Sequence, residues 1–200
     1  MRDKKVLEMT TTAMFAAIVL VMTFVPFMGF IVIGPVAITI IHIPVLIGGL
    51  FGGKRVAIAL GLTFGIGSLF RSLMTPDGLN IFFQNPLVSV LPRLLFGIAL
   101  WYLYVLFNRL IKNKLISIAV TFGLSTVLHT VFTLTALYLF AFQSQLFQDF
   151  FGDMNVINFI WAIAGFNGII EVLIAIFIAT PIAWRIKDYN RYEEEHDETL

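Results

Sequence analysis

Long apolar runs dominate this sequence and constrain its fold more than any other feature. Runs of about 18 residues or more are long enough to cross roughly 30 Å of hydrocarbon as helices. Of the 200 residues, 59% are hydrophobic and only 12% are charged, which is too little charge to coat a water-facing surface. The sequence therefore predicts an all-α integral membrane protein.

Six apolar segments predict six transmembrane helices. The breaks between them are rich in glycine, proline and charge, as in GGKR at 52–55 and TPDG at 75–78, and such residues end helices. We expect one six-helix membrane domain over residues 1–185 and a charged cytoplasmic tail over 186–200. The predicted spans are 9–28, 36–51, 56–72, 86–107, 115–142 and 156–184.

The basic residues predict how the chain is oriented. With six crossings, eleven of the thirteen lysines and arginines fall on one side, and only Arg71 and Arg93 do not. The positive-inside rule places that side, and with it both termini, in the cytoplasm. The charges therefore predict a multi-pass membrane protein with both termini in the cytoplasm. The eleven are Arg2, Lys4, Lys5, Lys54, Arg55, Arg109, Lys112, Lys114, Arg185, Lys187 and Arg191.

The sequence gives little support for an enzyme or for a bound cofactor. The chain has no cysteine, which excludes disulfides, thiolate metal sites and thiol nucleophiles. Residues 48–54 (GGLFGGK) resemble a phosphate-binding loop, but Arg55 stands where the magnesium-binding hydroxyl belongs. These glycines predict a tight cytoplasmic turn instead. We expect no catalytic residue, metal site or cofactor in this chain; an intramembrane enzyme using Glu171 and His129 is the minor alternative.

Polar residues inside the predicted spans carry the functional information, because an unpaired polar group in hydrocarbon is costly. In the fourth span Asn85, Ser89, Arg93 and Gly97 recur every four residues, which places them on one helical face. We expect this polar stripe to face a cavity or a partner.

The fifth and sixth spans carry similar polar groups, among them Thr126 and Thr130. Since three consecutive spans place polar residues in their middle or outer portions, we predict an outward-opening pocket between them. The candidate binding residues are Arg93, Asn85, Ser89, His129, Thr133, Trp161, Asn167 and Glu171.

The candidate residues suggest the chemistry of a ligand. The guanidinium of Arg93 suits a carboxylate, while asparagine and histidine suit hydroxyls and amides. Trp161 and phenylalanines would supply apolar walls. The expected ligand is small and anionic, with amide and hydroxyl groups. Two alternatives stay open: Arg93 could pair with Glu171, and the hydroxyl residues could bond their own helix backbone.

Two pairs of small residues predict close helix contacts. Ala13 and Ala17 lie four apart in the first span, a spacing that lets another helix approach closely. They predict either docking of a partner or packing within the chain. Gly61 and Gly65 form a similar pair in the third span, where internal packing is the simpler interpretation.

Three stretches of the sequence carry a family resemblance. Residues 33–69 (IGPVAITIIHIPVLIGGLFGGKRVAIALGLTFGIGSL), residues 85–98 (NPLVSVLPRLLFGI) and the pair Ala13 and Ala17 resemble the substrate-binding S components of energy-coupling factor (ECF) transporters. The branch they look like is the pantothenate type.

The resemblance implies that binding of the substrate and use of ATP belong to different subunits. The S component would bind a vitamin on the outer side, under the loop between the first two helices, roughly residues 29–39. It would dock through Ala13 and Ala17 on a membrane scaffold (T) subunit, and two partner ATPases would use ATP and magnesium; no nucleic acid is involved. The alternatives are another vitamin or precursor (riboflavin, folate or a thiamine precursor) and a stand-alone secondary carrier.

Overall fold

The computed structural model describes residues 2–25, 27–33, 36–76, 78–140, 145–152, 158 and 167–186. Within these ranges five helices are long and apolar enough to cross a membrane, so the chain is a helical, multi-pass membrane protein. The elements in chain order are α1 (Arg2–Phe24), β1 (Phe30–Ile33), β2 (Val36–Thr39), α2 (His42–Gly52), α3 (Lys54–Met74), the 3-10 helix η1 (Gly78–Gln84), α4 (Pro86–Leu110), α5 (Lys114–Phe140), α6 (Gln145–Phe151), α8 (Ile169–Ile174) and the π-helix η3 (Ala175–Ala179).

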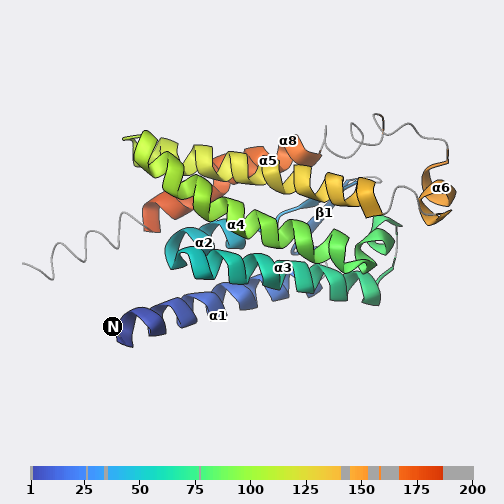
Figure 1. The fold of residues 1–200 in the computed structure, drawn as a ribbon, viewed down its shortest axis with the longest axis horizontal. Coiled ribbons are helices and arrows are strands. Elements are labelled where there is room, and N and C mark those ends of the chain that lie inside the picture. The colour runs from blue at the N-terminus through green and yellow to red at the C-terminus, as the bar shows by residue number, and fades with distance from the viewer. Residues whose placement is uncertain are drawn as a thin grey trace, which may run out of the picture.

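The helices run back and forth along one axis (Figure 1). The start of α1 and the end of the last helix, Ile169–Ile186, lie at the same end of the bundle, here called the N-terminal end. The α2–α3 turn also lies there, and Gly53 makes it with a φ of 82°, a backbone conformation that favours glycine. The tight turn predicted from the glycines is confirmed. The opposite end, which carries β1, β2 and η1, is called the hairpin end.

The predicted second span is partly wrong. Val36–Thr39 is a strand that pairs antiparallel with β1, with Phe30 opposite Thr39. Its β-branched residues favour an extended backbone, and hydropathy alone does not separate a short apolar strand from a helix. The helix that follows, α2, has 11 residues and spans about 17 Å.

The other predicted spans are close to the observed helices. The helices α3, α4 and α5 agree with their predicted spans to within three residues at each boundary, whereas α1 begins earlier and ends at Phe24 rather than at residue 28. The last helix is described from residue 167. Apart from residue 158, the beginning of the sixth span lies outside the described residues, as does the predicted tail apart from residue 186.

The main apolar core lies in the half of the bundle nearest the N-terminal end. Helix α4 packs against both α3 and α5, and a Cβ at Gly61 of α3 would lie 2.5 Å from the carbonyl oxygen of Arg93. The internal packing predicted for Gly61 and Gly65 is confirmed, because Gly65 similarly faces the backbone of Val90. The largest buried side chains of this core are Phe64, Phe96, Phe122, Ile41, Leu46, Leu60, Leu100, Ile118, Val19 and Val45.

Candidate binding cavity

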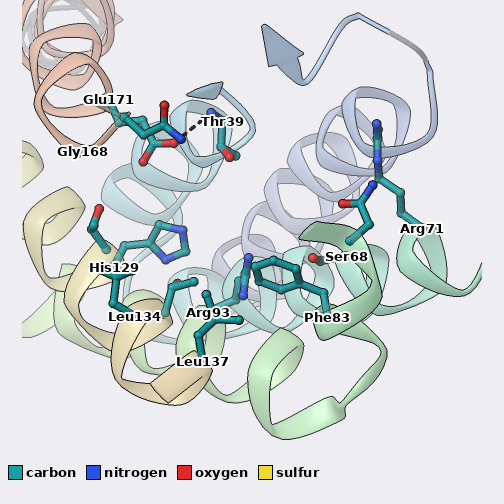
Figure 2. A pocket seen from close by; sticks show the side chains of 14 residues that line it. Thr39, Ser68, Arg71, Phe83, Arg93, His129, Leu134, Leu137, Gly168 and Glu171 are labelled. Carbon is teal, nitrogen blue, oxygen red and sulfur yellow. Dashed lines mark hydrogen bonds between the residues drawn. The ribbon is translucent and has the colours of Figure 1, made fainter. Parts of the chain in front are cut away.

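A cavity of about 150 Å³ lies towards the hairpin end, with far more room than a single water molecule requires. Its walls come from the parts of α3, α4, α5 and the last helix that lie nearest that end, together with β2 and η1. Figure 2 shows these side chains surrounding the open space. The lining residues are Thr39, Ser68, Arg71, Asn80, Phe83, Arg93, His129, Thr130, Thr133, Leu134, Leu137, Asn167, Gly168 and Glu171.

Arg93 brings a buried cation to the cavity wall. Its side chain is only 7% exposed, and the guanidinium carbon lies 4.7 Å from the ring centre of Phe83 and 5.5 Å from that of Phe64. Its Nη1 donates to the carbonyl of Val88 at 2.8 Å. Its Nε is buried and finds no hydrogen-bond partner among the described residues. A buried donor of this kind is costly unless something bonds to it.

Helix α5 contributes two further buried polar atoms. His129 packs between the rings of Phe64 and Phe96, at centroid distances of 5.7 and 4.9 Å. Within the described part of the chain, neither its Nδ1 nor the hydroxyl of Thr133 has a hydrogen-bond partner. Both line the cavity, so a ligand there would meet groups ready to bond to it.

Other hydroxyls of α5 bond within their own helix. Thr126 donates to the carbonyl of Phe122 at 2.9 Å, and Thr130 donates to that of Thr126 at 3.2 Å. The backbone-bonding alternative therefore holds for these two residues. Of the two, only Thr130 reaches the cavity wall.

Glu171 places a carboxyl group on the wall formed by the last helix. It is 7% exposed, and its Oε1 accepts a hydrogen bond of 2.8 Å from the backbone N–H of Thr39 (Figure 2). This bond joins the hairpin to a helix 132 residues later in the chain. Among the described side chains, Arg93 and Glu171 do not come within ion-pair distance of each other, and each bonds to a backbone group.

The residues of the polar stripe of α4 do not share one environment. Asn85 caps the helix by accepting the N–H of Leu87 at 2.9 Å, and Ser89 is buried and donates to the carbonyl of Phe83. Neither residue lines the cavity. The candidates that the structure brings together are Arg93, His129, Thr133, Asn167 and Glu171; Trp161 lies outside the described residues.

Arg71 is the main lining residue that the sequence-based list of binding residues missed. It comes from the last turn of α3, and its Nη1 donates to the carbonyl of Thr23 in α1 at 2.6 Å. The sequence did hold a signal for it: Arg71 and Arg93 are the two cations that fall outside the predicted cytoplasmic segments. A cation displaced from the basic side marks a functional position in a membrane protein.

The predicted docking pair lies on the outside of the bundle. Ala13 and Ala17 are both exposed on α1, while Val19 and Thr23 of the same helix are fully buried. The pair is therefore not used for packing among the described residues of this chain.

Comparison with known proteins supports the resemblance seen in the sequence. Residues 7–183 match the family described as ECF transporter, substrate-specific component. A pantothenate transporter PanT of Leuconostoc mesenteroides subsp. mesenteroides is 27% identical over 194 residues, which cover 91% of this chain and 93% of that protein. A pantothenic acid transporter PanT of Lactococcus lactis subsp. cremoris is 28% identical over 197 residues, covering 91% of this chain and 94% of its own. The chain thus belongs to the substrate-specific components of ECF transporters, and it is a transporter subunit rather than an enzyme.

Proposed function

We propose that this chain captures pantothenate at the outer face of the bacterial plasma membrane. The observation that carries the proposal is the cavity itself, which is lined by Arg93, whose buried Nε has no hydrogen-bond partner among the described residues. Pantothenate offers a carboxylate, an amide and two hydroxyls, and the cavity offers a cation and several polar side chains. The two relatives named as transporters of this vitamin support the same choice.

The proposed orientation places the cavity outside and both termini inside. Lys54 and Arg55 begin α3, and Arg109 lies in the last turn of α4; both positions are at the N-terminal end. The positive-inside rule assigns that end to the cytoplasm. In this arrangement α2 serves as a short second membrane helix, which gives six helices in all. The hairpin of β1 and β2 then covers the cavity from outside.

Delivery of the vitamin is assigned to partner subunits. The chain would dock on a membrane scaffold (T) subunit that binds two ATPases, with ATP and magnesium used there. The exposed pair Ala13 and Ala17 is the proposed contact, because small residues let a partner helix approach closely.

Bulky substitutions test the docking surface. Ala13→Trp and Ala17→Trp are expected to abolish vitamin uptake by cells and leave pantothenate binding to the purified chain unchanged. Leu124→Trp, at an exposed position of α5, is the control and should leave both unchanged. Co-purification of the Ala17→Trp chain with the complete module, at the wild-type yield, would exclude this contact.

Titration of the purified chain in detergent tests the choice of vitamin. Heat or tryptophan fluorescence should report saturable pantothenate binding with a dissociation constant in the micromolar range or below. Pantothenol, in which a neutral alcohol replaces the carboxylate, should bind at least about 30-fold more weakly, since a charge-assisted contact contributes roughly 2 kcal/mol. Riboflavin, folate and thiamine precursors serve as the comparison panel. Saturable binding of one of these, with no binding of pantothenate, would refute the proposal.

A further inference from the structure

The two polar walls of the cavity differ in what they offer a ligand. Arg93 presents only donors, because a guanidinium has no acceptor. Glu171 accepts the N–H of Thr39 through Oε1, and a carboxylate has two oxygens with about four acceptor sites between them. Acceptor capacity therefore remains on a side chain that lines the cavity.

These two groups lie on separate sides of the cavity. Figure 2 shows Glu171 beside Thr39 on one side of the open space and Arg93 beside Phe83 on another. The bond from Thr39 holds the Glu171 carboxyl in place, while the Val88 carbonyl and two aromatic rings hold Arg93. Since each group is held by its own neighbours, the cavity keeps a donor side and an acceptor side.

Of these two groups, only Arg93 suits the carboxylate of an elongated anion. A carboxylate placed against Glu171 would face acceptor oxygens, and like charges in a buried site are costly. A carboxylate at Arg93 gains a charge-assisted hydrogen bond. Hydroxyl groups at the other end of the ligand can then donate to Glu171.

We infer that Glu171 is a specificity-determining residue that binds the hydroxyls of the ligand's acyl group, while Arg93 binds its carboxylate at the other end. The inference rests on the proposed function and adds to it the direction in which the vitamin lies. It also assigns a selectivity: N-acyl amino acids of similar shape that lack the hydroxyls should be discriminated against at the Glu171 side.

The test combines one substitution with three ligands. Glu171→Gln keeps the shape of the side chain and removes its charge. It is titrated with pantothenate, with pantothenol, and with a dideoxy analogue of pantothenate in which hydrogens replace both hydroxyls. We expect about a tenfold weakening for pantothenate and for pantothenol, because both keep the acyl hydroxyls. The dideoxy analogue should change by less than about threefold, which also shows that the variant is folded.

Glu8→Gln is the matched control. Glu8 lies at the N-terminal end, where its carboxylate is 3.7 Å from the guanidinium of Arg55, and none of the three affinities should change. If the dideoxy analogue binds too weakly to titrate, the ratio of pantothenate to pantothenol affinity still decides between the two orientations of the ligand. That ratio stays constant in Glu171→Gln under the proposed orientation.

Three results would overturn the inference. Equal weakening of all three ligands would reduce Glu171 to a structural role. A gain in pantothenate affinity relative to pantothenol would show the carboxylate lying beside Glu171, in the reverse orientation. Failure of the wild-type chain to bind pantothenate at all would remove the proposed function, and the inference with it; this outcome differs from the first two, in which the wild-type chain does bind.

Discussion

The two ends of the bundle differ in what fills the space between the helices. Towards the N-terminal end the buried side chains are mostly apolar and the helices approach closely, with Gly97 of α4 against Gly61 of α3. Towards the hairpin end a cavity of about 150 Å³ is lined by both polar and apolar side chains, and some of its polar atoms lack partners within the described part of the chain. The first arrangement favours stability. The second leaves bonding capacity for a ligand at a cost in stability.

Helix α4 passes from one arrangement to the other within a single turn. Gly97 packs into α3, whereas Arg93, four residues earlier, lines the cavity. The carbonyl of Arg93 contacts the position where Gly61 lacks a side chain. The packed end thus sets the position of the backbone that carries the buried cation, and the two ends depend on each other.

The largest expected effect comes from breaking the packed end. Gly61→Leu would force α3 and α4 apart, because even its Cβ would lie 2.5 Å from the carbonyl oxygen of Arg93. We expect a loss of about 3 kcal/mol of stability together with loss of pantothenate binding. Thermal unfolding in detergent measures the first effect and titration the second.

Thr135→Leu is the control for this substitution. Thr135 is exposed on α5, so leucine there should leave both stability and binding unchanged. Wild-type unfolding temperature and affinity in Gly61→Leu would contradict the link between the two ends.

A smaller effect distinguishes the cavity from the rest of α5. Thr133→Val removes a buried hydroxyl that has no partner among the described residues, so pantothenate affinity should fall by about 1 kcal/mol, or roughly fivefold. Thr126→Val removes a buried hydroxyl that bonds its own helix and does not line the cavity. It should leave the affinity unchanged. Equal effects of the two substitutions would argue against a ligand contact at Thr133.

Helical periodicity in the sequence predicts which polar residues share a face of a helix, but it does not predict what each of them contacts. Asn85, Ser89, Arg93 and Gly97 do share a face of α4, yet they serve as a cap, a backbone bond, a cavity wall and a packing contact. The role of each residue depends on which neighbouring element lies opposite it at its position along the helix. Periodicity within one helix carries no information about that neighbour.

Two other differences have physical causes. The strand Val36–Thr39 is apolar enough to belong to a span, and its pairing with β1 depends on another segment of the chain. The sequence marks Arg71 as a cation away from the basic side, but its place in the cavity follows from the packing of α3 beside α1 and η1. The first feature depends on pairing with a neighbouring segment and the second on tertiary contacts, and composition and spacing alone determine neither.

Buried polar groups at the hairpin end lower the stability of the fold and favour ligand binding, and Arg93→Met separates these two effects. Methionine keeps an unbranched side chain that can fill the space and removes the guanidinium. Thermal unfolding without ligand and titration with pantothenate are measured on the same preparation, with Arg109→Gln at the exposed end of α4 as the control. We expect the ligand-free variant to be at least as stable as wild type, because it removes a buried donor that has no partner among the described residues, while pantothenate affinity falls about 30-fold or more. A variant that is less stable and still binds pantothenate with wild-type affinity would contradict both expectations.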